Sequence, residues 1–306
     1  MAAGEHRMKL LFTGVGGTAA WTMRGEQMAA VRPQWRALPN ATKDDFQDCD
    51  AVVIVKHISD AGLADLKAWG GPIVYDTLDF WSQQPSTRSN PNPAQDIDNA
   101  AAARSLFQPI FARIDPDIIL CPTAAMKHDL APLGWKTEVF YHHFDPRLAA
   151  DEVDHHRRKR VLYHGKRKHL GIWAIAARIS CWIHGAEFKM SNGPQPLPAD
   201  VMLAARAGRH GTWLSRSWKS NVKAAMAGRL GVPFVAWPEA AYTETHPQGL
   251  WFTSPWGMHR ALGKALKMER QAPETVLYSV EWCADRLERI IGEHLATAKM
   301  KASAQS

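Results

Sequence analysis

Residues 216–233 read Arg-Ser-Trp-Lys-Ser-Asn-Val-Lys-Ala-Ala-Met-Ala-Gly-Arg-Leu-Gly-Val-Pro. Within this stretch Trp218, Val222 and Met226 follow helical spacing and form a mostly apolar face, which predicts a helix over 217–229. Residues 233–236 continue as a short apolar run, which predicts a buried strand. A helix that leads into a buried strand is typical of an α/β fold.

The same alternation of strand and helix runs through the rest of the chain. Apolar runs predict strands at 8–13, 51–55, 72–75, 117–121, 137–140, 161–165, 186–190, 201–205 and 250–252. Helical segments separate these runs, which indicates parallel sheets covered on both faces. A charged stretch at 151–160 marks the expected boundary between a Rossmann-like domain at 1–150 and a second one at 151–306.

The composition is that of a globular protein, and its positive charge favours an anionic partner, although proteins that bind no anion can also have a mildly basic surface. The chain has 306 residues and a net charge of +7, which is long enough for two domains of about 150 residues each. No apolar run approaches the roughly 20 residues of a membrane span, and the first residues lack a secretory signal, so we expect a cytoplasmic protein. The four scattered cysteines predict neither disulfides nor a zinc site.

Glycines follow the first predicted strand, in Gly14-Val15-Gly16-Gly17-Thr18-Ala19. Ligands of doubly wound sheets bind beyond the carboxyl ends of the strands, so Gly14, Gly16 and Gly17 are candidate cleft residues. The spacing fits a dinucleotide-binding pattern, and Arg36 could contact a 2′-phosphate, which keeps an NADP-dependent oxidoreductase as an alternative. A tight turn without a ligand is the other interpretation.

Charged side chains follow the next two strands. Lys56 and His57 come after residues 51–55 and are further candidate cleft residues, although Lys56 could only neutralise the carboxylates and His57 could be a satisfied strand-end residue. Asp76 and Asp79 come after residues 72–75. A carboxylate in a cleft can take the proton of an acceptor hydroxyl, so we predict Asp79 as the general base, with Asp76 second. Either carboxylate could instead cap the following turn. A polar loop at 81–95 follows, without an assigned role.

Lys219 and Lys223 lie one turn apart on the predicted helix of 217–229. Like charges at this spacing cost about 0.2 to 0.5 kcal/mol, and each cation in a first turn opposes the helix dipole by about 0.3 to 1 kcal/mol. An anion at the helix N-terminus would reverse both penalties. We therefore predict that a phosphate group binds here, and a solvated basic helix end is the other interpretation.

These residues carry a resemblance to a known family. Asn221, Lys223, Gly231 and Pro233, with Glu239, Tyr242 and Glu244 after the strand, resemble the donor-binding region of GT-B glycosyltransferases, especially small ones from bacteriophage genomes. The resemblance implies two Rossmann-like domains that face each other across a cleft. It also implies a nucleotide-sugar donor on the C-terminal domain and a last helix that crosses back to the first domain.

The resemblance also implies roles for individual residues. Lys219 and Lys223 would bind the donor pyrophosphate with Arg206, next to Gly165 and Lys166, and Asn221 would lie in the same region. Glu239, Tyr242 and Glu244 would hold the sugar or the ribose, and His143 would border the cleft. Many relatives have a glutamate for the ribose where this chain has Met226. The family usually needs no metal, so we expect no metal site, the Glu152-Val153-Asp154 segment included, and no cofactor beyond the donor, which we expect to be a UDP-sugar.

The acceptor is predicted less directly. The phage-like resemblance, the positive charge and the basic clusters at 157–160 and 166–169 slightly favour a hydroxymethylated base in duplex DNA, so that the enzyme would work in the cytoplasm of a host cell. A saccharide of a cell-surface glycan is the alternative acceptor. From other classes, the NADP-dependent oxidoreductase and a non-catalytic nucleic-acid-binding protein stay open.

Overall fold

The computed structural model describes residues 7–79, 97–148, 158–192 and 197–305. The polar loop at 81–95 and the Glu152-Val153-Asp154 segment lie outside these ranges. In the N-terminal half, six strands form one sheet in the order β2-β1-β3-β4-β5-β6. All five pairings are parallel, as predicted. The strands are β1 (Leu10–Gly14), β2 (Arg36–Ala37), β3 (Ala51–Val55), β4 (Ile73–Asp76), β5 (Ile118–Cys121) and β6 (Thr137–Val139).

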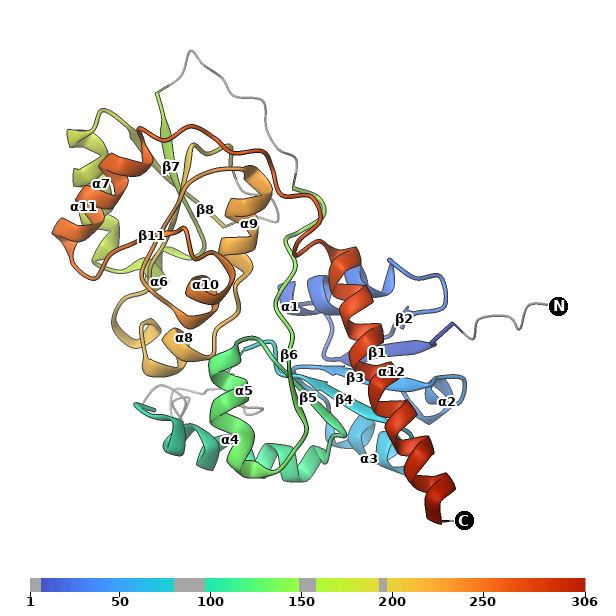
Figure 1. Cartoon of the computed structure of the whole chain (residues 1–306). Helices are drawn as coiled ribbons and strands as arrows, with labels where there is room; N and C mark the ends of the chain where they lie inside the picture. Colours follow the sequence, from blue (N-terminus) through green and yellow to red (C-terminus); the bar gives the residue numbers. More distant parts are fainter. Residues whose placement is uncertain (1–6, 80–96, 149–157, 193–196, 306) are drawn as a thin grey trace.

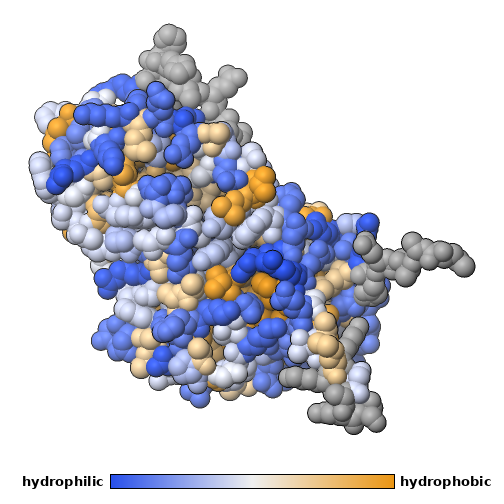
Figure 2. Space-filling view, viewed as in Figure 1, coloured by the Kyte–Doolittle hydropathy of each residue, from blue (hydrophilic) through white to orange (hydrophobic). Residues whose placement is uncertain are grey.

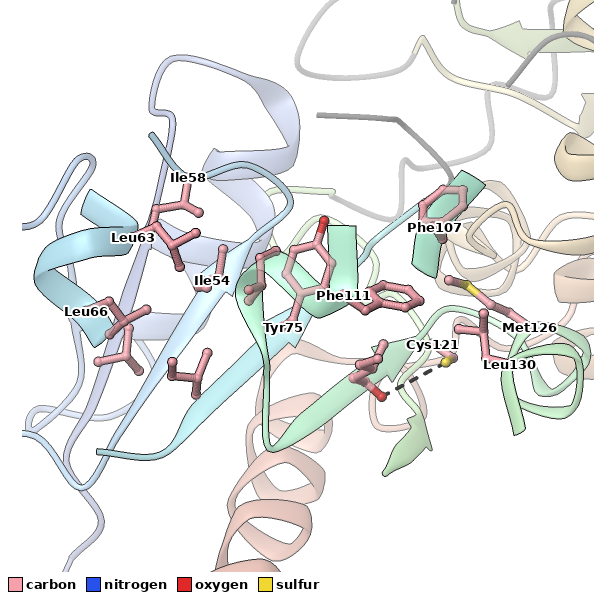
Figure 3. Close-up of a cluster of buried hydrophobic side chains, with 14 of the residues drawn as sticks. Ile54, Ile58, Leu63, Leu66, Tyr75, Phe107, Phe111, Cys121, Met126 and Leu130 are labelled. Atoms are coloured by element: carbon pink, nitrogen blue, oxygen red, sulfur yellow. Dashed lines mark hydrogen bonds between the residues drawn. The ribbon is translucent and has the colours of Figure 1, made fainter. Parts of the chain in front are cut away.

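Helices cover both faces of this sheet. They are α1 (Ala19–Trp21), which continues as a π-helix (Thr22–Gln27), then α2 (Lys43–Phe46), α3 (Asp60–Trp69), α4 (Ala100–Ile114) and α5 (Ala124–Leu130), which ends in a 3-10 turn (Ala131–Leu133). On one face, α3, α4 and α5 bury their apolar side chains against β3, β4 and β5. Figure 3 shows Leu63 and Leu66 beside Ile54, and Phe111 between Tyr75 and Met126.

The second half forms a parallel sheet of its own, in the order β11-β10-β9-β7-β8. Its strands are β7 (Arg160–His164), β8 (Glu187–Ser191), β9 (Val201–Ala204), β10 (Phe234–Ala236) and β11 (Leu250–Trp251). Its helices are α6 (Arg167–Leu170), α7 (Trp173–Ile183), a 3-10 turn (Gly208–His210), α8 (Trp213–Ser217), α9 (Val222–Leu230), α10 (Ala240–Thr245) and α11 (Pro255–Ala265). Helices α7 and α11 cover one face, and α9 covers the other. The expected α/β class with two Rossmann-like sheets is confirmed.

The last helix, α12 (Val280–Gln305), crosses back to the first sheet. Cys283, Leu287 and Ile291 are fully buried in the same cluster as Leu10 and Phe12 of β1. Figure 1 shows this helix, in red, alongside the N-terminal sheet. The predicted crossing is therefore confirmed. The predicted domain boundary at residue 150 lies outside the described residues and stays a prediction, and the strands of each sheet come from one side of it.

The predicted single helix over 217–229 is wrong. Helix α8 ends at Ser217, and α9 begins at Val222. Between them Trp218 is fully buried in the core of the N-terminal half, 5.4 Å from the ring of Phe107, and its Nε1 donates to Asp129. Burial of a whole indole outweighs the helix propensity of one turn. Lys219 therefore lies in a connecting turn, and only Lys223 lies in a first helical turn.

Among the described residues, no helix combines the length and the apolar character that crossing a bilayer requires.

Candidate active site

Both sheets place polar residues at their switch points, where the strand order reverses and ligands of open α/β sheets bind. In the first sheet this point lies between β1 and β3, whose carboxyl ends lead into the glycine loop and into Lys56. In the second sheet it lies between β7 and β9, which lead into Gly165 and Arg206. The predicted cleft residues therefore follow the strand ends where a ligand is expected.

Asp79 lies between two lysines from different domains. Its Oδ1 is 2.8 Å from Nζ of Lys56, and its Oδ2 is 2.7 Å from Nζ of Lys219. Burial raises the pKa of the Asp79 carboxyl, but the charges of Lys219 and Lys56 outweigh burial, so its pKa lies well below the usual value. Asp79 is therefore ionised, and its pair with Lys219 ties the two domains together across the site.

The backbone around this carboxylate is strained. Lys56 and Leu78 have φ values of 66° and 54°, in the left-handed region that side chains other than glycine, asparagine and aspartate seldom enter. The hydroxyl of Tyr75 donates to the carbonyl of Lys56, which helps to hold this conformation. Such strain costs about 1 to 3 kcal/mol per residue and gathers at functional sites. The surrounding structure therefore imposes on Lys56, and on Leu78 just before Asp79, a backbone conformation that these residues do not favour by themselves.

Asp76 has a different environment from Asp79. It is 3% exposed, with Oδ2 3.1 Å from Nε of Arg24, and its Oδ1 accepts from the amide of Leu78. Arg24 also donates to the carbonyls of Phe140 and Tyr141. Burial raises the pKa of Asp76, against the opposing charge of Arg24. Asp76 thus makes the turn-capping bond that was its alternative interpretation, inside a buried ion pair.

Cations of the second domain gather beside Asp79. Lys223 is 8% exposed and lies with Nζ 4.2 Å from the ring centre of Tyr163, and Nε of Arg206 donates to Glu239 at 3.0 Å. Burial, followed by the charge of Arg206, lowers the pKa of Lys223 to about 7, although Glu239 opposes the shift. Burial also lowers the pKa of Lys219. Two lysines with lowered pKa values mark a place where an additional anion would be stabilised.

Several buried polar atoms around this cluster make no hydrogen bond to the described residues. They are Tyr163 Oη, Asn221 Nδ2, Glu239 Oε2, His57 Nδ1 and His143 Nδ1. An unsatisfied buried donor or acceptor costs about 1 to 3 kcal/mol, so a native protein usually satisfies it with a ligand or water. Five such atoms among the predicted site residues and their neighbours are consistent with a site that completes its hydrogen bonds by binding a polar ligand.

A cavity of about 230 Å³ opens next to Arg206 and Glu239. Its wall also contains Arg216 and the rings of Trp173 and Trp237. Aromatic rings can stack on a base, while arginine and glutamate can bind phosphate and hydroxyl groups. The cavity therefore has the chemistry of a nucleotide site.

Two predicted donor residues lie at the contact between the domains. The carboxylate of Glu244 accepts from the amides of Ala124 and Ala125 at 2.8 and 3.2 Å, and from the hydroxyl of Tyr141. Asn221 accepts from the amide of His142 at 2.6 Å. Glu244 thus caps α5 across the domain contact. Its predicted role toward the donor stays a prediction. Lys166 is exposed next to Gly165, and Tyr242 is fully buried beside Arg206.

The predicted cleft residues of the first domain lie at its strand ends. A Cβ at Gly14 would lie 2.7 Å from the carbonyl oxygen of Val55, so only glycine lets this loop pass so close to β3. Gly17 has a φ of 74°, and Gly16 lies between the two. Burial lowers the pKa of His57 and of His143, so both rings are neutral at pH 7. His143 Nε2 contacts Gln27 Oε1 at 3.0 Å.

Sequence reasoning did not assign a site role to Arg24, Tyr163 or Trp218. Arg24 follows the glycine loop and Tyr163 lies in the predicted strand at 161–165, so their places near strand ends were the available signal. Trp218 resembled an ordinary core position of a helix, and no local pattern marks it as an anchor to the other domain. Among the described residues, no group of three or more His, Cys, Asp or Glu side chains could hold a metal ion.

No protein-family model and no curated protein matches the chain. Among solved structures, it is similar to AviGT4, a glycosyltransferase involved in avilamycin A biosynthesis, with a TM-score of 0.55 and 12% identity over 95% of this chain and 98% of that chain. The apo lipopolysaccharide outer core galactosyltransferase WaaB matches with a TM-score of 0.43 and 9% identity, over 96% of this chain and 100% of that one. The glycosyltransferase SnogD from Streptomyces nogalater matches with a TM-score of 0.38 and 14% identity, over 98% and 99% of the two chains. The likeness to AviGT4 shows the fold, which is that of the GT-B glycosyltransferases.

Proposed function

We propose that this protein transfers a sugar from a nucleotide diphosphate donor to the hydroxyl of an acceptor. One observation carries the proposal: Lys56, Lys219, Lys223 and Arg206 gather at the switch points with Asp79 and Glu239 as carboxylate partners. The excess of positive charge suits the pyrophosphate of a donor. During transfer it stabilises the negative charge that develops on the leaving diphosphate.

The second domain provides the proposed donor site. Lys219 and Lys223 contact the pyrophosphate, at the N-terminus of α9. The nucleoside occupies the cavity lined by Trp173, Trp237 and Arg206, and the unsatisfied oxygen of Glu239 accepts from a ribose or sugar hydroxyl. We propose a UDP-sugar as the donor, because its small pyrimidine suits a cavity of about 230 Å³.

Asp79 is the proposed general base. With both lysines in place it is a weak base, because they stabilise its ionised form. A bound pyrophosphate competes with Asp79 for Lys219, and the loss of that neighbour raises the proton affinity of the carboxylate. Donor binding thus prepares Asp79 to take the acceptor proton. His57, neutral and with an unsatisfied Nδ1, is a second proton acceptor in the same cleft.

For the acceptor, we propose a hydroxymethylated base in duplex DNA as the first candidate, in keeping with the resemblance to small phage glycosyltransferases, and a saccharide as the second. The charge argument for DNA is weaker than the sequence indicated. Lys159 and Lys166 lie at opposite ends of β7, about 20 Å apart at the rise of a strand. Lys159 also donates to the carbonyl of Leu266. Of the described residues in these two basic clusters, only those after β7 lie at the cleft end of the sheet.

The NADP-dependent alternative has less support. The helix after the glycine loop is α-helical for its first three residues and then continues as a π-helix, and the side chain of Thr18 already accepts from the amide of Trp21 in its first turn. Arg36 is exposed and donates to the carbonyl of Asp45. We also keep the cytoplasm as the proposed location, since all four cysteines are free thiols.

The test is mass spectrometry of acceptors after incubation with a panel of nucleotide sugars. The acceptors include hydroxymethylcytosine DNA and oligosaccharides. We expect a mass increase of one sugar on one acceptor, abolished in Asp79→Asn and in Lys223→Met. His57→Asn discriminates the two proton acceptors, because it should keep measurable turnover if Asp79 is the base. A chain that hydrolyses no donor, glycosylates no acceptor and is not stabilised by UDP, UDP-sugars or other nucleoside diphosphates would refute the proposal.

A further inference from the structure

Helix α7 carries an apolar face that the fold leaves uncovered. Ile172, just before the helix, and Ile175, Ile179, Trp182 and Ile183 are between 53% and 78% exposed. At about 100° per residue these side chains fall within one arc of roughly 100°. Trp173, Ala174, Ala177 and Cys181 occupy the opposite arc and are buried against the sheet. The helix is thus apolar on both sides, and within the described part of the chain only one side has a partner.

The neighbouring helix α11 extends this surface. It packs along α7, and His184 stacks on His259, which stacks on Trp256. The ring of Trp256 is 68% exposed. In Figure 2, hydrophobic side chains lie among hydrophilic ones at the upper left, where Figure 1 places α7 and α11. We call the exposed side chains of 172–183 and Trp256 the α7–α11 patch. Exposed apolar patches of this kind mark interaction surfaces.

The charged side chains of α7 and α11 have one sign. Arg178 borders the apolar arc, and Arg260, Lys264 and Lys267 lie exposed along and just after α11. The segments 172–186 and 254–268 contain no aspartate or glutamate. An isologous contact with a second copy would bring the same cations close together, which disfavours a dimer through this patch. The charge complements an anionic partner instead.

We propose that the α7–α11 patch docks the protein on the surface of an anionic lipid bilayer. An amphipathic helix with tryptophan on its apolar side and cations at its border lies in the plane of a membrane interface, with the apolar side chains below the head groups. Two exposed tryptophans suit this depth, because indole rings favour the boundary between head groups and acyl chains. Peripheral docking of this kind needs no spanning helix. Ile172 also lines the cavity beside Arg206, so the patch reaches the rim of the proposed donor site.

The test is co-sedimentation of the whole chain with vesicles of phosphatidylcholine mixed with phosphatidylglycerol, and with vesicles of phosphatidylcholine alone. We expect binding to the anionic vesicles, and binding that weakens as salt is added. The double variant Ile179→Ser/Trp182→Ser should lose it. Each of Arg260→Gln and Lys264→Gln should weaken it about fivefold. Val276→Ser and Met300→Ser, at exposed apolar positions of other segments, are the matched controls and should bind as the unchanged chain does.

All variants are checked by melting temperature and by UDP binding, neither of which should change, because the substituted side chains are exposed and lie outside the proposed donor site. Equal binding by the unchanged chain and the double variant would overturn the proposal. So would a failure to bind anionic vesicles. A concentration-dependent dimer that Ile179→Ser/Trp182→Ser disperses would overturn it in favour of a second copy. None of these results depends on glycosyl transfer.

Discussion

Replacement of Asp79 by asparagine tests the ion pairs at the centre of the site. The Asp79 side chain is 9% exposed and contacts two lysines whose side chains are 15% and 19% exposed. Asparagine keeps the shape but leaves two largely buried ammonium groups without their counter-charge. Removal of one partner of a buried pair costs about 3 to 5 kcal/mol. Because both lysines keep some contact with water, we expect the lower end, about 3 kcal/mol. At roughly 2 to 4 °C for each kcal/mol, the melting temperature should fall by about 6 to 12 °C.

The same substitution should tighten the binding of UDP. In the unchanged protein Lys219 must leave Asp79 to reach a phosphate, and a hydrogen bond between charged groups contributes about 1.5 kcal/mol or more. Without that competitor the affinity should rise about tenfold. Calorimetric titration with UDP and a thermal melt with and without UDP measure both effects. Asp285→Asn, which removes an exposed partner of Arg32, is the control and should change neither. An unchanged melting temperature, or UDP binding weaker than in the unchanged protein, would refute the competition between Asp79 and phosphate.

Three further substitutions probe the neighbouring contacts. Lys223 has a pKa of about 7, so its charged form is lost as the pH rises through 7, and the affinity for UDP should fall above that pH by up to tenfold per pH unit. Titration calorimetry from pH 6 to about pH 9 should show this fall in the unchanged protein and not in Lys223→Arg. The same pH dependence in both proteins would refute the reasoning. Glu244→Gln should weaken the cap of α5 and so lower the free energy of unfolding, measured in urea, by about 1 kcal/mol, while the affinity for UDP stays unchanged. Weaker UDP binding would indicate that Glu244 contacts the donor. Arg24→Met should lower the free energy of unfolding by about 3 to 5 kcal/mol in the same assay, because Asp76 is left buried without its partner. The double variant Arg24→Met/Asp76→Asn should recover part of this stability. If it recovers none, the ion pair is not the cause of the loss.

The fold could be predicted from the sequence because its strands are short, continuous and apolar. The strands at Ala51–Val55 and Arg160–His164 agree with the predicted positions to within one residue. Periodicity and apolar runs are properties of short segments of sequence. In this protein each strand is buried on both faces of its sheet, which agrees with the strand conformation that its own apolar residues favour. The sheet order then brings the residues after β1, β3, β7 and β9 to the two switch points.

The contacts between domains could not be predicted in this way. Helix α8 ends before Trp218 because the indole ring packs into the core of the other domain. Residues 213–222 contain no signal for a contact with residues so far away in the chain. The pairing of Asp79 with Lys219 joins residues 140 positions apart in the chain. From the sequence, the lysines required a phosphate as their counter-charge, whereas a carboxylate of this chain already neutralises one of them. The unfavourable charge–charge and helix-dipole energies of the two lysines indicated that an anion lies near them, but they did not show whether it is a phosphate or a carboxylate.

The crossing of α12 affects how the protein can fold during synthesis. One face of the first sheet is covered by Cys283, Leu287 and Ile291, which leave the ribosome long after β6 is complete at Val139. At typical rates of translation the delay is roughly 8 to 30 s. Throughout that interval α1 covers part of this face with Trp21, but the apolar surface that α12 later covers stays open to solvent. We expect the chain to depend on chaperones during this period, and a fragment that ends before Val280 to aggregate when it is produced alone.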